Sequence, residues 1–393
     1  MTERKAGAAS AGRSRRLSAA ALTLPLVAAG LLPAATSTAH AATSRDPGIA
    51  VAMGDSYISG EAGRWMGNSV TFTGSRAGTD RAWTGIGYSA SRVYGTSAKN
   101  GCDRSDSSEV ISAFSVYQAV NIACAGAHTE DLYRASNGGE SFKGEAPQAD
   151  QLAEIAEQDR VGLIALSIGG NDLGFTDLIA DCVKSYELSG PDCVPDAQEA
   201  IDAKIDTAME NVGAAVDEIR AVMSAAGYSD SDYRIVLQSY LSPVPRSSEV
   251  RYPESGWSRT DTGGCPATDN ALDWARDGMV PQVAERLSQV AADRGVQFLD
   301  VQDLLQGHEV CSTSARLATS SQKPSAATSE WARFLTTGLT QGTLRESFHP
   351  NYYGQLALGR CLSLIADEPA DRNYTCHNTP GEDTSGVYLD EAS

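Results

Sequence analysis

Five short apolar runs along the chain predict buried β-strands. Each run is rich in β-branched residues or alanine, and its apolar character is continuous rather than alternating. That pattern is typical of strands covered on both faces, as in a parallel sheet. The runs cover residues 48–53, 119–123, 161–168, 233–239 and 296–301.

Helical patterns lie between these strands and after the last of them. They cover residues 147–158, 196–226, 279–294 and 352–366. Alternation of strands and helices implies right-handed crossovers that place helices on both faces of the sheet. The sequence therefore predicts the α/β class, as a three-layer α/β/α sandwich around a five-stranded parallel sheet.

Three long insertions separate parts of this pattern, at residues 59–116, 241–277 and 303–348. Loops of this length are usually functional or pinned by cross-links. They carry all five tryptophans, which either line an apolar substrate cleft or fill small cores under the loops. The tryptophans are Trp65, Trp83, Trp257, Trp274 and Trp331.

The N-terminal segment, residues 1–41, has the pattern of a secretory signal peptide. A basic start is followed by an apolar run through Leu32 and by the small-residue site Ala39-His40-Ala41. We expect cleavage after Ala41 and a secreted, extracellular protein. A retained anchor is the alternative, and the pair Arg15-Arg16 leaves a twin-arginine export route open. We expect a single domain over residues 42–376 and an acidic, flexible tail over 377–393.

Charge and hydropathy exclude several kinds of partner. The chain has 31 basic and 50 acidic side chains, a formal net charge of −19. Such a surface repels nucleic acid and anionic membranes. No run after the N-terminal segment approaches the roughly 20 apolar residues of a membrane span.

The eight cysteines all lie beyond residue 41, which favours disulfides in an oxidising compartment. We expect nearest neighbours to pair, because each pair then closes a segment that reads as a loop. The expected pairs are Cys102–Cys124, Cys182–Cys193, Cys265–Cys311 and Cys361–Cys376. The tight Cys-x-x-Cys or Cys/His spacing of a zinc site is missing from the sequence, so we expect no metal.

Candidate chemistry lies just after the strands, since ligands bind at the carboxyl ends of parallel strands. Gly54-Asp55-Ser56 follows the first run and can expose a serine hydroxyl near a helix N-terminus. Gly126 follows the second run and lets a backbone N–H approach a ligand closely. Asn171 follows the third run and offers uncharged amide donors. Each string alone also reads as an ordinary cap, turn or Asx turn.

A histidine near the end of the chain completes this set. His349 lies directly before the last predicted helix, and Pro350 disfavours helix at His349 and places it in a loop. A serine hydroxyl becomes a good nucleophile only when a base accepts its proton, and histidine is the usual base. His128, beside Gly126, is the competing candidate.

Together, the strings GDSYISG, ACAGAHT, SIGGND and ESFHPN resemble the four blocks of the SGNH (GDSL-type) hydrolase family, in the same order. They look most like those of secreted lipases and esterases of filamentous actinobacteria. The resemblance implies Ser56 as nucleophile and His349 as general base and then acid. It also implies an oxyanion hole made by the N–H groups of Ser56 and Gly126 and by the side chain of Asn171. The implied strand order is 2-1-3-4-5, and no cofactor is implied.

One position departs from the family. The family usually has aspartate three residues before the histidine, and this chain has Glu346 there. A glutamate can orient imidazole with a different reach. We therefore expect Glu346 to complete a triad, although some relatives use a backbone carbonyl and only a Ser-His dyad.

The expected function is hydrolysis of carboxylic esters through an acyl-enzyme, by a monomer acting on a small-molecule or lipid ester. A carbohydrate or metabolite O-deacetylase and a phospholipase are alternatives that the same site serves. A binding protein that keeps the fold without the chemistry is the alternative from another class. The presence of all four catalytic residue types weighs against it.

Overall fold

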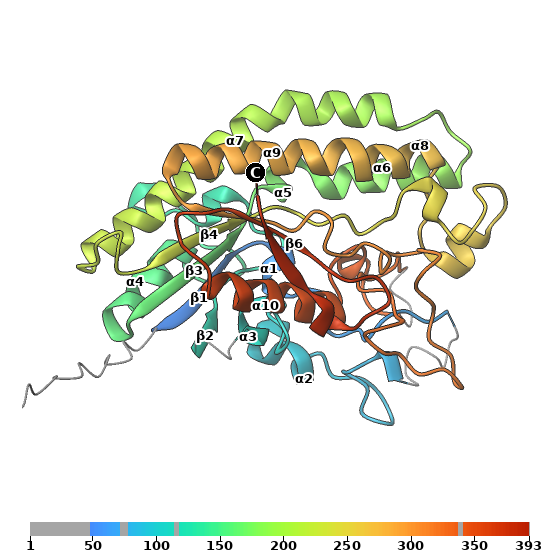
Figure 1. The fold of residues 1–393 in the computed structure, drawn as a ribbon, viewed down its shortest axis with the longest axis horizontal. Helices are drawn as coiled ribbons and strands as arrows, with labels where there is room; N and C mark the ends of the chain where they lie inside the picture. The colour runs from blue at the N-terminus through green and yellow to red at the C-terminus, as the bar shows by residue number, and fades with distance from the viewer. Residues whose placement is uncertain (1–47, 71–77, 114–117, 337–340, 393) are drawn as a thin grey trace, which may run out of the picture. The chain divides into compact units, whose positions relative to one another are not determined.

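A central parallel sheet organises the computed structural model of the protein, which describes residues 48–70, 78–113, 118–336 and 341–392 (Figure 1). The strand order is β2-β1-β3-β4-β5-β6-β7. The strands are β1 (Ile49–Gly54), β2 (Gln118–Asn121), β3 (Val161–Ser167), β4 (Arg234–Gln238), β5 (Gln297–Asp300), β6 (Tyr374–His377) and β7 (Tyr388–Glu391). The five predicted strands are present in the order 2-1-3-4-5, and all their pairings are parallel.

The C-terminal part of the sheet corrects the expectation of a flexible tail. β6 pairs parallel with β5, and β7 pairs antiparallel with β6. The disulfide between Cys361 and Cys376 ties β6 to the preceding helix, and the rings of His377 and Tyr388 lie 5.5 Å apart. The polar composition of this segment suits an edge strand, which needs one apolar face at most. The sheet therefore has two strands more than predicted.

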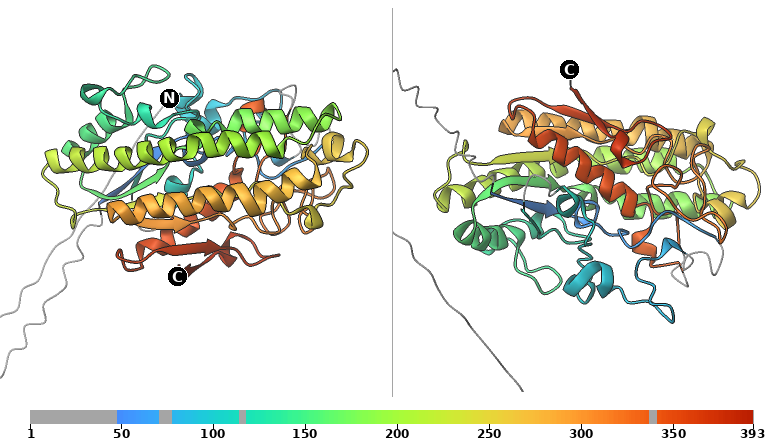
Figure 2. Two further views of the ribbon diagram at one scale, coloured as in Figure 1. Left: turned by 90° about the horizontal axis from the view of Figure 1, so that it is seen from above. Right: turned by 60° about the horizontal axis from the view of Figure 1, so that its bottom comes forward.

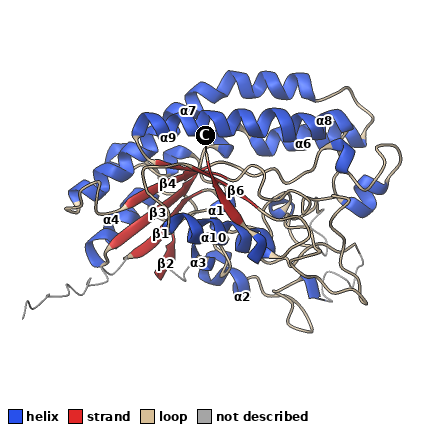
Figure 3. Ribbon diagram, viewed as in Figure 1, coloured by secondary structure: helices blue, strands red, loops and turns tan. Residues whose placement is uncertain are grey.

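Helices cover both faces of the sheet (Figures 1 and 3). The long helices α7 and α9 lie side by side on one face, and α10 with the short α3 lies on the other (Figure 2). The four predicted helices correspond to α4, α7, α9 and α10, whereas the pattern analysis missed α6. The helices are α1 (Ser56–Ser59), α2 (Ser91–Tyr94), α3 (Glu109–Ser112), α4 (Gln148–Gln158), α5 (Gly170–Leu173), α6 (Phe175–Glu187), α7 (Val194–Ala225), α8 (Asp269–Trp274), α9 (Val280–Arg294) and α10 (Tyr352–Ala366).

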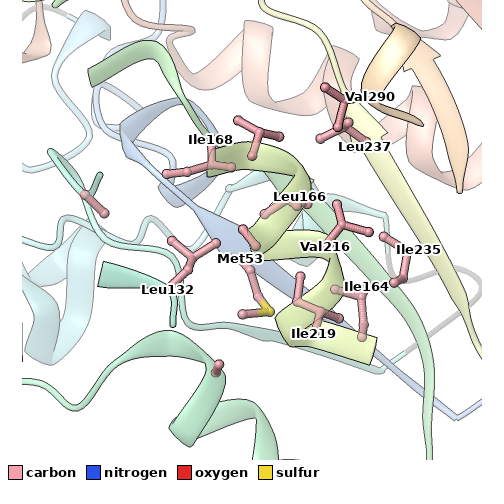
Figure 4. Close-up of a cluster of buried hydrophobic side chains, with 14 of the residues drawn as sticks. Met53, Leu132, Ile164, Leu166, Ile168, Val216, Ile219, Ile235, Leu237 and Val290 are labelled. Carbon is pink, nitrogen blue, oxygen red and sulfur yellow. The ribbon is translucent and has the colours of Figure 1, made fainter. Parts of the chain in front are cut away.

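Two apolar cores explain why the strands are hydrophobic throughout. Met53 of β1 packs in the core between the sheet and α7, together with Ile164 and Val216 (Figure 4). Its neighbour Ala52 points to the opposite face and packs in the core under α10. Successive side chains of a strand point to opposite faces, so a strand between two helix layers must be apolar at every position.

Four disulfides join the predicted pairs, Cys102–Cys124, Cys182–Cys193, Cys265–Cys311 and Cys361–Cys376. Residues 46–393 form one compact unit. The predicted signal peptide, residues 1–41, lies outside the described residues. Among the helices that the structure describes, each is too short or too polar to cross a membrane.

Candidate active site

Ser56 lies at the carboxyl end of β1, in a sharp turn from strand to helix. Gly54 has φ of 135°, and a Cβ atom there would lie 1.9 Å from the carbonyl oxygen of Ser167, so only glycine fits. Asp55 caps α1, because its Oδ1 accepts a hydrogen bond of 3.0 Å from the N–H of Tyr57. The turn therefore places Ser56 as the first residue of a helix, where the helix dipole favours negative charge.

His349 is held in the loop that enters α10. Asn351 caps that helix by accepting from the N–H groups of Tyr353 and Gly354. Phe348, the residue before His349, has φ of 60°, which is costly for a residue with a side chain. Two backbone hydrogen bonds to Arg333 hold this backbone in place. The N–H of Phe348 donates to the Arg333 carbonyl at 2.7 Å, and the N–H of Arg333 donates to the His349 carbonyl at 2.8 Å.

Ser56 and His349 form a hydrogen-bonded pair across 293 positions of the sequence. The Nε2 atom of His349 lies 2.7 Å from the Oγ of Ser56. Its Nδ1 lies 2.9 Å from the carbonyl oxygen of Ser347. A carbonyl only accepts, so Nδ1 carries the ring hydrogen and Nε2 is left as the acceptor for the serine hydroxyl. This is the tautomer that a general base needs.

The imidazole is kept neutral by its surroundings. The pKa of His349 is lowered to about 4, mainly by burial and with a smaller contribution from the nearby Arg345 cation, while the bond to the Ser347 carbonyl opposes this shift. The ring of Tyr57 packs on it with 4.9 Å between centroids. A neutral imidazole beside a serine hydroxyl can accept its proton throughout the neutral range.

A consequence is an unusually low acid limit of activity. We expect the acid limb of kcat/KM to lie near pH 4, because protonation of His349 removes the acceptor and its pKa is lowered from 6.5 to about 4. A pH profile of ester hydrolysis between pH 3 and about 9 measures it. Asp55, whose pKa burial raises to about 7, also titrates beside Ser56, so the Asp55→Asn profile is the control. A limb near pH 6.5 that persists in Asp55→Asn would contradict the expectation.

Glu346 does not orient the histidine, which corrects the expectation of a triad. Its carboxylate accepts from the hydroxyl of Tyr94 at 3.0 Å and from the N–H of Thr343 at 2.6 Å. The bond to Thr343 belongs to a capping box that turns the carboxylate back toward the start of its own 3₁₀ turn. The carbonyl of Ser347 takes the position at Nδ1 instead.

Gly126 lies in a turn that is fixed on several sides. It has φ of 84°. The disulfide Cys102–Cys124 ends just before it, and the N–H of Cys124 bonds to the carbonyl of Gly54 beside Ser56 at 3.1 Å. The ammonium of Lys143 donates to the carbonyl of Ala125. The turn is thus tied to the end of β1.

Asn171 is held against the same turn. Its Nδ2 donates to the carbonyl of Ala127 at 2.8 Å, which leaves its second amide hydrogen available. The next residue, Asp172, accepts a 2.5 Å bond from the hydroxyl of Thr129. Within the described residues, the structure contains no hydrogen bond from the N–H of Ser56 or of Gly126. These two N–H groups and the second amide hydrogen of Asn171 therefore have no partner in the part of the chain that the structure describes.

The other histidines beyond residue 47 are placed elsewhere. His128 is exposed and lies 3.9 Å from Asp172, so it does not compete for Ser56. His308 is buried and stacks on Trp331 with 4.1 Å between ring centroids. Over the described ranges, no group of three or more His, Cys, Asp or Glu side chains is arranged to hold a metal ion.

An apolar cleft opens beside the Ser-His pair. Tyr57 and Phe348, the neighbours of Ser56 and His349, form one end of it, and its volume out to the open mouth is about 850 Å³. Its other walls come from α6 and from the segment 240–280. Trp274 is the one tryptophan in its lining; Trp65 and Trp331 are fully buried, and Trp257 is exposed.

Two residues of the site were not identified from the sequence. A backbone carbonyl was the alternative to Glu346, but no residue pattern reveals that the carbonyl of Ser347 is the one that faces Nδ1 of His349. Tyr240, which bonds to Asp55, follows β4 at the same edge of the sheet as Ser56, so its position after a strand was a usable signal.

The fold and the site define a class of α/β protein with a serine and a neutral histidine at the carboxyl edge of a parallel sheet. Residues 52–356 match the model of the GDSL-like Lipase/Acylhydrolase family. The chain therefore belongs to this family, as the four sequence blocks predict.

The individual proteins that the chain resembles share only about a quarter of its residues or fewer over the matched regions. The chain is 27% identical over 192 residues to Lipase 1 of Streptomyces coelicolor, a match that covers 49% of this chain and 56% of that relative. Two solved structures are similar: an extracellular lipase of Streptomyces rimosus (21% identity, TM-score 0.44) and phospholipase A1 of Streptomyces albidoflavus (23% identity, TM-score 0.43). Each match covers 81% of this chain and 98% of the other.

Proposed function

We propose that the protein is an exported esterase or lipase that hydrolyses carboxylic esters with an apolar acyl group. The observation that carries this proposal is the 2.7 Å contact between the Oγ of Ser56 and the unprotonated Nε2 of His349, at the end of an apolar cleft. Membership of a lipase and acylhydrolase family supports it. Four disulfides support export to an oxidising compartment.

In the first half of the reaction, the Oγ of Ser56 attacks the ester carbonyl while Nε2 of His349 takes the serine proton. The carbonyl oxygen becomes an oxyanion, which accepts hydrogen bonds from the N–H groups of Ser56 and Gly126 and from the amide of Asn171. The resulting imidazolium is stabilised by its Nδ1 bond to the Ser347 carbonyl. Its proton passes to the departing alcohol, which leaves an acyl-serine.

In the second half, a water molecule attacks the acyl-serine and gives a proton to Nε2 of His349. A second oxyanion forms in the same hole. Its collapse returns the proton to the Oγ of Ser56 and releases the carboxylic acid. The cycle uses only side chains and backbone groups of the protein, and each proton that His349 accepts is given back.

The cleft favours an acyl chain longer than acetyl. Its lining is aliphatic, aromatic, proline or sulfur-containing, which offers a long acyl chain burial from water and offers a sugar few polar partners. An O-deacetylase needs room only for a methyl group beside the serine. Phospholipid esters have the same apolar chains, so phospholipase activity stays an alternative that the substrate panel below tests.

Chain-length preference tests this proposal. We expect kcat/KM on p-nitrophenyl octanoate to exceed that on the acetate by about tenfold or more, since each buried methylene contributes roughly 0.8 kcal/mol. Ala271, a buried residue of the cleft wall, gives a second test. Ala271→Trp should fill the cleft and lower octanoate hydrolysis far more than acetate hydrolysis.

The matched control for that variant is Ala180→Trp, on the exposed side of α6 and outside the cleft lining. It should leave the chain-length preference as it is. A strict preference for acetate in the unmodified protein would favour the deacetylase alternative. Release of fatty acid from phosphatidylcholine vesicles would add phospholipid to the substrates.

A further inference from the structure

Tyr240 is a buried tyrosine in the wall of the apolar cleft. It follows β4 directly and is 3% exposed. Its ring meets Tyr57 and Phe175 edge-on, with 5.1 and 5.4 Å between centroids. A phenol hydroxyl in such apolar surroundings needs hydrogen-bond partners, because an unpaired buried polar group is costly.

The hydroxyl finds one partner on each of two loops. It donates to Oδ2 of Asp55, the residue before Ser56, and accepts from the N–H of Gly170, the residue before Asn171, at 2.8 Å. The contact with Gly170 is close: a Cβ atom there would lie 3.0 Å from Cζ and 3.1 Å from the hydroxyl of Tyr240. One oxygen atom therefore joins the nucleophile turn to the loop of Asn171.

The carboxylate of Asp55 passes this constraint on to the nucleophile. Its other oxygen, Oδ1, accepts from the N–H of Tyr57. The Asp55 side chain therefore links the residue before Ser56 to the residue after it. Asp55 itself is only 1% exposed. Without the Tyr240 hydroxyl, the Oδ2 atom and the N–H of Gly170 both lose their buried partner.

We propose that the hydroxyl of Tyr240 is a positioning group that sets two of the three oxyanion donors, the N–H of Ser56 and the side-chain amide of Asn171. This inference rests on the proposed ester hydrolysis and adds Tyr240 to the residues on which that reaction depends. Donors stabilise an oxyanion only when they are held at the right distance before the charge develops. The ring of Tyr240 separately shapes the acyl cleft, so hydroxyl and ring have distinct roles.

The test is Tyr240→Phe, which removes the hydroxyl and keeps the ring. We expect kcat on p-nitrophenyl octanoate to fall by about 10- to 100-fold, since loss of one oxyanion donor costs on the order of 100-fold or more. KM and the chain-length preference should change by less than about twofold, because the cleft wall is intact. A purely structural role would instead lower the melting temperature without this kinetic split.

Tyr228→Phe is a matched control. The hydroxyl of Tyr228 also accepts from a backbone N–H, that of Val161 at 3.0 Å, and donates to the carbonyl of Asp159 at 3.0 Å. This tyrosine sits at the start of β3, the end of the strand away from Asn171. Its loss should reduce stability and leave kcat as it is.

A double variant tests the route of the effect. In an Asn171→Ala background, one of the donors that Tyr240 positions is already missing, so Tyr240→Phe should cost several-fold less than in the unmodified protein. Should Tyr240→Phe be insoluble, Asp55→Asn weakens the same bridge from its other end, because an amide N–H replaces the carboxylate oxygen that accepts from the hydroxyl, while Oδ1 stays as the acceptor for Tyr57. We expect it to lower kcat in the same way.

Unchanged kcat in folded Tyr240→Phe, an equal loss in Tyr228→Phe, or fully multiplicative effects with Asn171→Ala would each overturn the inference and leave the ester hydrolase proposal standing. An unmodified protein that neither cleaves the esters nor reacts with a fluorophosphonate would overturn both.

Discussion

Ser56→Ala should abolish ester hydrolysis, with kcat falling on the order of 10⁶-fold, as expected when a serine nucleophile acts together with its base. The Oγ of Ser56 is the only atom of that residue that reaches Nε2 of His349, and alanine removes it alone. The measurement is kcat on p-nitrophenyl octanoate, with intact protein mass after fluorophosphonate treatment. The mass shift of one phosphonyl group should be lost in the variant.

Ser59→Ala is the matched control for this variant. Ser59 lies in the same short helix and is also buried, but its hydroxyl bonds to the carbonyl of Ser56 at 3.1 Å and not to the histidine. We expect activity within about threefold of the unmodified protein, since a single neutral hydrogen bond is worth about 1 kcal/mol. Hydrolysis that survives in Ser56→Ala would show that another group is the nucleophile.

His349→Ala and Glu346→Gln should differ by orders of magnitude. Loss of the base should lower kcat by about 10⁴-fold or more, because Ser56 then has no proton acceptor. Glu346→Gln should stay within a few-fold, because its side chain bonds to Tyr94 and Thr343 rather than to the imidazole. Glutamine keeps one acceptor oxygen, which can serve the N–H of Thr343, and its amide N–H can donate to the hydroxyl oxygen of Tyr94.

The two variants thus decide between a dyad and a triad. If Glu346 held the tautomer of His349, Glu346→Gln would reduce kcat by about 10⁴-fold, as the loss of an orienting carboxylate does. Exogenous imidazole offers a further check, because it can enter the space left in His349→Ala and act as the base. Recovery of activity with imidazole in His349→Ala but not in Ser56→Ala would confirm the assigned roles.

The sequence alone was enough to locate the five central strands and the residues of the Ser56–His349 pair. Strands between two helix layers are apolar at every position, so β1 and β3 are visible as continuous runs. Ser56, Gly126 and Asn171 each follow a strand, and the carboxyl ends of parallel strands meet at one edge. The order of these local signals therefore carried information about contacts that are distant in the chain.

The elements at the periphery of the fold, such as β7 and α6, were harder to predict because few of their side chains are buried. β7 is largely exposed and polar, which reads like a tail until its pairing with β6 is known. α6 has an apolar face, but none of its residues is fully buried, because that face lines the cleft. α6 forms one wall of the cleft and the segment around Trp274 forms another, and this arrangement exists only in the tertiary structure.

The partner of the histidine and the role of Tyr240 were decided only by the tertiary structure. Glu346 has a suitable side chain at a suitable spacing, but a capping box draws it toward Thr343, and the Ser347 carbonyl faces Nδ1 instead. Tyr240 and Asp55 are 185 positions apart, and nothing local to either residue marks their contact. Local patterns encode which faces of an element are buried; they do not encode which donor meets which acceptor, because that depends on the final packing of the whole chain.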